Sequence, residues 1–233
     1  MFNGKMKAIT FSYDDGVTQD KSLIEIFDRY DLKATFNINS ELLGKEGNLI
    51  RCDKRINHTK NNPNDIKKIY RNHEVAVHTL THPFLPDLPD DEIIRQVEND
   101  RINLEQLTEK SVIGMAYPGG GVNYNEHVAD VIRNNTGIEY ARTTVSSYNF
   151  DIQKDLYVFK ATVYSFNEWD KMIQLSNEFL NLETDTPKLL YIWGHAYEFD
   201  IYNTWEKFDE FCSLICHKDD IFYGTNREVL LSC

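Results

Sequence analysis

The chain has 233 residues, enough for one substantial hydrophobic core, and this length favours a single large α/β domain over residues 1–233. Its formal net charge of −12 argues against nucleic acid or an acidic membrane surface as the main partner. No apolar run reaches the roughly 18 residues of a membrane span, and the N-terminal segment lacks the apolar core of a signal peptide. The four cysteines form no CxxC pair and are expected to be free thiols, which fits a reducing compartment. A cytoplasmic location is therefore expected.

Short apolar runs alternate with amphipathic stretches along the chain. Strands are expected over 7–13, 34–38, 74–77, 112–117, 139–143, 157–162, 189–193 and 221–223. A first helix is expected around Leu23, Ile26, Phe27 and Tyr30, which fall at helical spacing. Further helices are expected over 63–70, 90–110, 125–135, 168–182 and 205–216, and from Thr225 onward. The polar, Asn-rich segment 44–62 is interpreted as a loop.

Seven or eight strands alternating with helices predict a parallel sheet, either open or closed into a barrel. Polar residues follow the carboxyl ends of five of these strands. In a β/α barrel those ends form one rim, where active sites are assembled, so the pattern favours a barrel. The residues at these ends are Asp14, Asp15, His78, Pro118, Gly119, Arg142 and His195.

Asp14 and Asp15 are adjacent carboxylates after the first strand, and burying both as anions is costly unless a cation is present. His78 and His82 are four residues apart, so one helical turn would point both imidazoles the same way. Two histidines and one carboxylate, from either aspartate, leave open coordination positions on a divalent metal. The pattern therefore predicts a metal site.

Such a metal can activate water and polarise a carbonyl, and the reaction also needs a base, an acid and an oxyanion site. One aspartate is free to take the water proton, and His195 is the candidate acid. The glycines after Pro118 allow backbone N–H groups to approach an oxyanion closely. The simpler structural interpretations are that the glycines after Pro118 form a strand-to-helix loop and that His195 is a hydrogen-bonded interior histidine.

Four segments resemble, in order, the motifs of the NodB-homology polysaccharide deacetylases, carbohydrate esterase family four in the broad sense. Residues 11–16, Phe-Ser-Tyr-Asp-Asp-Gly, resemble the first motif, Thr-Phe-Asp-Asp-Gly, and residues 78–82, His-Thr-Leu-Thr-His, resemble the second, His-Ser/Thr-x-x-His. Residues 117–120, Tyr-Pro-Gly-Gly, are similar to the third, Arg-x-Pro-Tyr-Gly, and residues 192–195, Ile-Trp-Gly-His, to the fifth, Leu-x-x-His. The first two motifs together are specific, whereas the other two are weak alone.

The resemblance implies a distorted (β/α)₇ barrel and metal-dependent removal of an N-acetyl group, less often an O-acetyl group, from a carbohydrate. The metal would be zinc, with cobalt, nickel or manganese as alternatives. By position the family roles fall on Asp14 as base, Asp15, His78 and His82 as metal ligands, Gly119 with Pro118 and Tyr117 at the oxyanion and substrate site, and His195 as acid.

The chain departs from this pattern at the third motif, which lacks its arginine. Arg142, at the end of a later strand, could supply the same positive charge to the base, unless it is an ordinary surface arginine. Gly119 replaces the usual tyrosine, so a backbone donor remains but a ring is lost.

A clear fourth motif is also missing. Trp193 and the pair Trp169-Asp170 are candidates for its apolar wall, and a core role explains them equally well. Glu198 and Asp200 are the carboxylates nearest to His195 in sequence. Tyr124, Tyr148 and Tyr197 are candidates for stacking on a sugar.

Three functions stay open on the sequence alone. The first is a deacetylase acting on an acetylated oligosaccharide or small amino sugar. The second is hydrolysis of another non-peptide C–N bond, such as that of a small cyclic amide, which a narrow pocket would favour. The third is a non-catalytic sugar-binding protein, for which the missing arginine argues.

Overall fold

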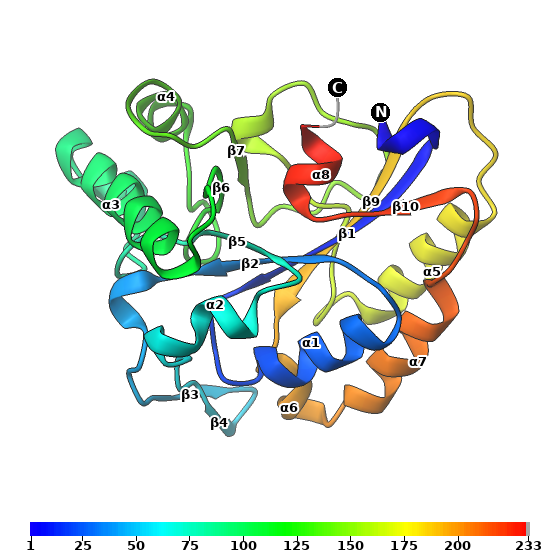
Figure 1. Cartoon of the computed structure of the whole chain (residues 1–233), viewed down its shortest axis with the longest axis horizontal. Coiled ribbons are helices and arrows are strands. Elements are labelled where there is room, and N and C mark those ends of the chain that lie inside the picture. The colour runs from blue at the N-terminus through cyan, green and yellow to red at the C-terminus, as the bar shows by residue number, and fades with distance from the viewer. Residues whose placement is uncertain (232–233) are drawn as a thin grey trace.

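A curled, parallel sheet forms the centre of the computed structural model, which describes residues 1–231 (Figure 1). Its strands are β1 (Lys7–Asp14), β2 (Ala34–Ile38), β5 (Glu74–Val77), β6 (Gly114–Ala116), β7 (Tyr140–Arg142), β8 (Val163–Tyr164), β9 (Lys188–His195) and β10 (Ile221–Tyr223). They are ordered β7-β6-β5-β2-β1-β9-β8, and β10 pairs with β1 outside this path. All eight residues of β1 are buried because β1 is flanked by β2 and β9 and covered on both faces.

Helices flank this sheet, with α3 and α4 on one side and α5 and α7 on the other (Figure 1). They are α1 (Asp20–Arg29), α2 (Ile66–Ile69), α3 (Asp90–Thr108), α4 (Glu126–Asn135), α5 (Trp169–Leu180), α6 (Glu198–Tyr202), α7 (Trp205–Ile215) and α8 (Asn226–Leu230). The half-barrel with flanking helices confirms the predicted α/β barrel class. No helix within residues 1–231 combines the length and apolarity needed to cross a membrane.

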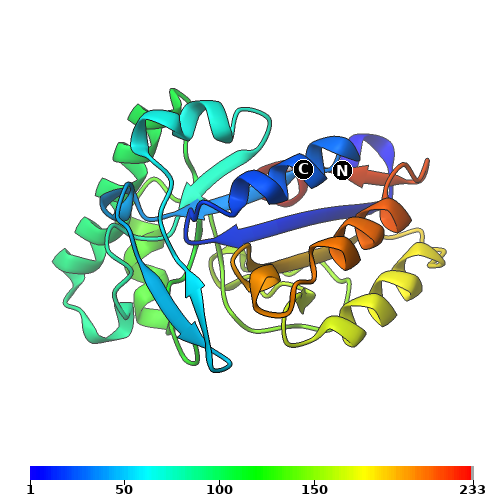
Figure 2. The same cartoon turned by 90° about the horizontal axis from the view of Figure 1, so that it is seen from below.

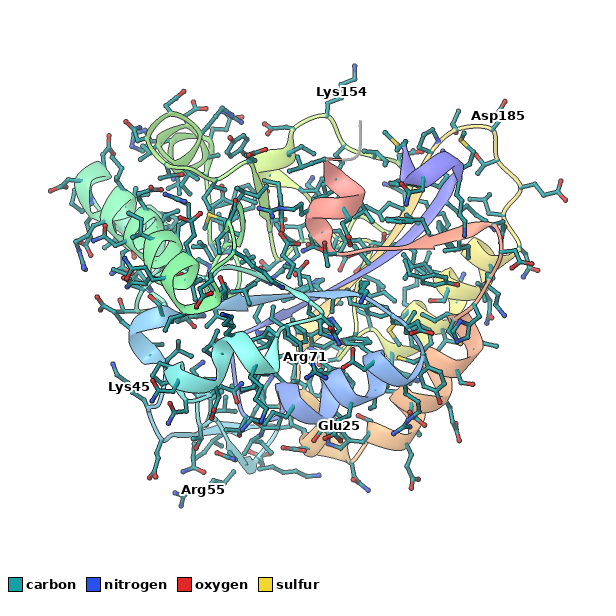
Figure 3. The ribbon with its side chains drawn as sticks, viewed as in Figure 1. Glu25, Lys45, Arg55, Arg71, Lys154 and Asp185 are labelled. Atoms are coloured by element: carbon teal, nitrogen blue, oxygen red, sulfur yellow. The ribbon has the colours of Figure 1, made fainter. Side chains whose placement is uncertain are left out.

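Amphipathic spacing explains how α1 is fixed to the sheet. Leu23 and Phe27 are fully buried, while Glu25 faces solvent (Figure 3). The Phe27 ring lies 4.7 Å from that of Phe11 on β1 and 5.8 Å from that of Phe208 on α7. These ring contacts lock the strand that ends at Asp14 against two helices.

The expectation of a plain loop over 44–62 is wrong. This segment contains an antiparallel hairpin of β3 (Asn48–Arg51) and β4 (Lys54–Asn57), which stands apart from the main sheet (Figure 2). Cys52 and Asp53 form its two-residue turn with φ values of 51° and 57°, the left-handed geometry of a tight hairpin. Such a turn is usually recognised in a sequence by a glycine, and the Cys52-Asp53 pair contains none.

The strand expected over 157–162 is also displaced. Leu156–Val158 is a 3₁₀ helix, and regular pairing begins only at β8. Phe159 donates its N–H to Ala141 of β7, whereas Thr162 donates to Tyr191 of β9. The segment therefore crosses from one neighbouring strand to the other before it can form a regular ladder.

Three cysteines are described as free thiols. Cys212 is buried on the apolar face of α7, Cys216 is buried at the C-cap of the same helix, and Cys52 is exposed. Cys233 lies outside the described residues.

Candidate active site

The carboxyl ends of the parallel strands bring the predicted residues to one cavity. Asp14 is in register with Asn37 of β2 on one side and with His195 of β9 on the other. On the far side of β5, Arg142 of β7 is in register with Ala116 of β6. The cavity measures about 670 Å³ and is lined by Asp14, Asp15, His78, His82, Tyr117, Gly119, Trp193 and His195, among others. Arg142 and Pro118 are buried and are not among its lining residues.

Asp14 is held by a buried arginine. Both of its carboxylate oxygens lie 2.6 Å from Nη2 of Arg142, and Oδ1 also accepts a hydrogen bond of 2.8 Å from Asn37. Arg142 is fully buried, with its guanidinium 4.3 Å from the centre of the Trp193 ring. Burial alone would raise the pKa of Asp14, but Arg142 and then His78 and His195 hold that pKa below its usual value. This ion pair excludes the reading of Arg142 as a surface residue.

Asp15, His78 and His82 could hold a metal ion, because one ligand atom from each lies within 4.8 Å of the others. Nδ1 of His78 donates to the Ala116 carbonyl at 2.9 Å, which leaves the Nε2 lone pair free. Burial lowers the pKa of His78 to about 4, so the ring is neutral at pH 7. A neutral imidazole is the form that binds metals.

The segment from His78 to His82 does not form the helical turn considered for it from the spacing of the two histidines. Thr79 and His82 have φ values of 67° and 60°, and the two imidazole centroids are still only 5.0 Å apart. Buried polar side chains fix this irregular turn: Asn39 donates to the His78 and Thr79 carbonyls, and Asp100 accepts the His78 N–H at 3.1 Å. The turn depends on these distant partners, so local spacing alone could not describe it.

Asp15 has two basic neighbours that the sequence interpretation missed, both from the segment after β4. Nζ of Lys60 lies 2.7 Å from the Asp15 carbonyl oxygen and 3.3 Å from Oδ1, and Nε2 of His58 lies 3.1 Å from Oδ2. The Lys60 side chain is only 6% exposed. Burial works to raise the pKa of Asp15, but Lys60 and His58 keep that pKa well below its usual value.

His195 lies between two carboxylates. Its Nε2 is 4.0 Å from Oδ2 of Asp14, and its Nδ1 is 3.1 Å from Oε1 of Glu198. Burial opposes the charged imidazole, but Glu198 and, less strongly, Asp15 and Asp14 raise the pKa of His195 above its usual value. Of the two carboxylates considered from sequence, Glu198 contacts His195, whereas Asp200 accepts from Gln19 and Trp205.

Glu198 is itself held by residues far away in sequence. Nη1 of Arg51, at the tip of the β3–β4 hairpin, lies 2.9 Å from Oε1, and the Tyr164 hydroxyl donates to the same oxygen. Arg51 also donates to Tyr164 and Tyr197. The hairpin thus supplies a permanent cation to the Glu198–His195 pair.

The glycine loop after β6 directs a backbone donor toward the cluster of Asp15, His78 and His82. Gly119, with a φ of 84°, donates its N–H to Nε2 of His82 at 3.3 Å. Asn123 holds the loop by donating to the Tyr117, Pro118 and Gly119 carbonyls. The Tyr117 hydroxyl donates its proton to the Tyr157 carbonyl, so it can only accept a hydrogen bond from a ligand.

Among the three tyrosines considered for sugar stacking, Tyr197 lines the cavity, with its ring centre 5.1 Å from that of His195. Tyr124 stacks on Tyr117, and Tyr148 donates to Glu168 away from the cavity. Trp193 lines the cavity and stacks on Tyr164, whereas Trp169 packs against Phe211.

Known proteins resemble this chain in sequence profile and in fold. The family profile described as polysaccharide deacetylase matches residues 3–141. A CE4-family pseudoenzyme from Bacillus anthracis superposes with a TM-score of 0.62 at 18% identity, covering 97% of this chain and 66% of its own. A mutant of that protein with restored enzymatic activity gives the same TM-score and identity, covering 97% and 68%.

A Mycobacterium smegmatis protein assigned to the polysaccharide deacetylases gives a TM-score of 0.70 at 15% identity, covering 98% of this chain and 90% of its own. Among functionally curated proteins, none matches the sequence significantly. The chain spans about two thirds of the length of the Bacillus anthracis protein, and at these identities the similarity concerns the fold.

Proposed function

Because the chain belongs to the polysaccharide deacetylase family, we propose that it is a metal-dependent hydrolase that removes N-acetyl groups from an amino-sugar oligosaccharide or polysaccharide. One observation carries the proposal: the Asp14 carboxylate lies between Arg142 and His195, directly beside the cluster of Asp15, His78 and His82. This arrangement supports the assignment of a base, an acid and a set of metal ligands around one cavity. Removal of O-acetyl groups is the less favoured variant of the same reaction.

The proposed cofactor is zinc, held by Asp15, His78 and His82. Two imidazole nitrogens and one carboxylate oxygen are a donor set that zinc accepts, with positions left open, and cobalt, nickel or manganese can occupy similar sites. When bound, a divalent metal would polarise the acetyl carbonyl and lower the pKa of a water molecule. The free Nε2 of His78 supports this assignment.

Asp14 would accept a proton from the attacking water. Its carboxylate is ionised at neutral pH because Arg142 holds its pKa below the usual value. Arg142 would also fix the orientation of the carboxylate by binding both oxygens, which is the task that the missing arginine of the third motif would have had.

His195 would donate a proton to the departing amine. The raised pKa of this imidazole, which depends on Glu198, keeps more of it protonated near neutral pH. The backbone N–H of Gly119, which donates to Nε2 of His82, would turn to the oxyanion if His82 binds the metal. Trp193 and Tyr197 would form the wall against which the acetyl group and sugar pack.

A non-catalytic sugar-binding role is the second candidate, because the Lys60 ammonium lies against the carboxylate oxygen of Asp15 that faces His82. A resident cation at that oxygen opposes metal binding. The two candidates share the cavity and differ in turnover.

Acetate release from a panel of N-acetylated oligosaccharides, with Zn²⁺ or Co²⁺ added, tests the proposal. We expect release by the wild-type chain and a rate at least about a hundredfold lower for Asp14→Asn. Metal binding without release from any member of the panel would overturn the deacetylase proposal. Retained sugar binding in that case would favour the second candidate, and turnover of a cyclic amide would favour cleavage of a different C–N bond.

A further inference from the structure

A second cavity, of about 300 Å³, lies at the opposite ends of the central strands from the candidate active site. Its wall includes Lys33 immediately before β2, Arg71 in the turn between α2 and β5, Glu74 at the start of β5, and Lys110 before β6. Figure 3 shows Arg71 beside the end of α2, well away from Lys45 and from Arg55 on the hairpin. Nothing in the proposed deacetylation uses this cavity.

The lining of this cavity is strongly basic in an acidic protein. Five permanent cations and two carboxylates line it, although the chain as a whole carries a net charge of −12. The cations are Lys33, Lys67, Arg71, Lys110 and Arg227, and the carboxylates are Glu74 and Glu228. A local surplus of positive charge against the overall charge favours the binding of an anion.

The two carboxylates offset only part of the positive charge of the five cations. Glu74 accepts hydrogen bonds from Thr35, Tyr140 and the Arg227 N–H, and its oxygen is 3.9 Å from Nε of Arg227. Glu228 accepts the Thr225 N–H at 2.8 Å as part of the capping box that begins α8. Both acids are therefore occupied by the folded chain itself.

Among the described residues, three of the five cations have no carboxylate partner. Lys67 pairs with Glu109 at 2.6 Å and Arg227 approaches Glu74. Within residues 1–231, no carboxylate forms an ion pair with Lys33, Arg71 or Lys110. Like charges that share a cavity repel one another, and a bound anion would relieve that repulsion.

Backbone contacts hold these three cations together. Nζ of Lys33 donates to the Asn72 carbonyl at 3.2 Å, and Nζ of Lys110 donates to the Arg71 carbonyl at 2.8 Å. Two ammonium groups from separate loops are thus anchored on adjacent carbonyls of the turn that carries the Arg71 guanidinium. Each ammonium has three protons, so both keep donors free for a ligand.

We propose that this cavity binds a small phosphate-bearing ligand, with Lys33, Arg71 and Lys110 contacting the phosphoryl oxygens. The planar fork of arginine matches phosphoryl oxygens, and lysine supplies point charges to the same group. The volume suits a phosphomonoester or diphosphate rather than a polymer. The inference does not rest on the deacetylase proposal.

Isothermal titration of the intact chain with inorganic phosphate, at low ionic strength, tests this site. We expect saturable binding at one site and a higher melting temperature in phosphate. The double variant Arg71→Gln/Lys110→Gln should weaken binding at least tenfold. The matched control, Lys45→Gln/Lys154→Gln, makes the same change in net charge at two exposed lysines elsewhere (Figure 3) and should leave the affinity within twofold.

Two further variants show whether phosphate binds in this cavity or elsewhere on the chain. Asp15→Ala removes a ligand of the proposed metal site and should leave phosphate binding unchanged; loss of binding in this variant would assign the phosphate to the metal. If the double variant does not fold, single Lys33→Gln serves in its place. Equal weakening by the control pair, no saturation by the wild type, or binding only to phosphatidic acid vesicles would overturn the proposal.

Discussion

At the carboxyl ends of the central strands, three buried carboxylates lie against permanently charged cations, whereas at the amino ends three cations have no carboxylate partner within residues 1–231. The carboxyl-end pairs are Asp14 with Arg142 at 2.6 Å, Asp15 with Lys60 at 3.3 Å and Glu198 with Arg51 at 2.9 Å. A buried carboxylate that keeps its charge requires such a partner. The amino-end cations, Lys33, Arg71 and Lys110, are half-buried or exposed and can stay unpaired because water solvates them.

This difference in charge pairing indicates which charge of ligand each end of the sheet favours. Charges at the carboxyl end are already balanced by the chain, so a divalent metal there adds positive charge next to resident cations and must compete with Lys60. Charges at the amino end are unbalanced and favour an anion. Four substitutions test what the charged pairs at the carboxyl end contribute to activity, stability and metal binding, and the one with the largest expected effect comes first.

Asp14→Asn should reduce the rate of deacetylation by about 10²- to 10⁴-fold, which is the usual contribution of a general base. The amide cannot accept the water proton and no longer forms the ion pair with Arg142, although its shape and its contact with Asn37 are nearly preserved. Initial rates of acetate release at saturating metal measure the loss. Metal stoichiometry should stay at the wild-type value, since Asp15, His78 and His82 are untouched; a variant that keeps a tenth of the activity would exclude Asp14 as the base.

Arg142→Gln should lower the free energy of unfolding by about 3–5 kcal/mol, because it leaves the Asp14 carboxylate buried without its cation. It also removes the packing of the guanidinium on Trp193. Urea denaturation of both proteins measures the change. Arg29→Gln, which breaks the exposed pair with Asp209, is the control and should cost about 0–1 kcal/mol. Equal costs would mean that the buried pair contributes no more than a surface one.

How far the carboxyl end could be predicted from sequence depends on which element supplies each residue. Asp14, His78 and Arg142 directly follow apolar runs, and parallel strands bring such residues to one rim whatever the details of packing. Their convergence was therefore predictable from periodicity alone. The resemblance to known motifs supplied the roles, which periodicity cannot.

The partners from the segment 44–62 could not be predicted in this way. Arg51 and Lys60 reach Glu198 and Asp15 only because the β3–β4 hairpin folds over the cavity, and its Cys52-Asp53 turn carries no glycine signal. One feature of the sequence did point to these partners: basic residues are concentrated in this segment of an otherwise acidic chain. The amino-end cavity was missed for the same reason, since its cations come from three separate loops.

Glu198→Gln should move the alkaline limb of the activity profile to lower pH. Burial lowers the pKa of His195 and Glu198 is the main group that raises it, so the variant imidazole loses its proton at a lower pH. A raised pKa of His195 stabilises the folded protein at pH values below the ordinary pKa of histidine, and this stabilisation is lost as the pH rises through the raised pKa. The difference in stability between the variant and the wild type should therefore shrink as the pH rises. Imidazole NMR titration measures the pKa directly. Asp200→Asn, whose carboxylate accepts from Gln19 and Trp205, should leave the limb in place.

Lys60→Gln should increase the affinity for zinc about tenfold, equivalent to about 1.4 kcal/mol. The Lys60 ammonium lies 3.3 Å from Oδ1 of Asp15, so it repels a dication and competes for the oxygen that faces His82. Glutamine removes the charge and keeps an N–H donor for the Asp15 carbonyl, which lysine contacts at 2.7 Å. Competition with a chromophoric zinc chelator measures the affinity, and Lys45→Gln, at an exposed lysine on the same segment, should leave it unchanged. Weaker binding by Lys60→Gln would mean that the lysine organises Asp15 for the metal, and the balanced charges of the carboxyl end would then assist metal binding rather than oppose it.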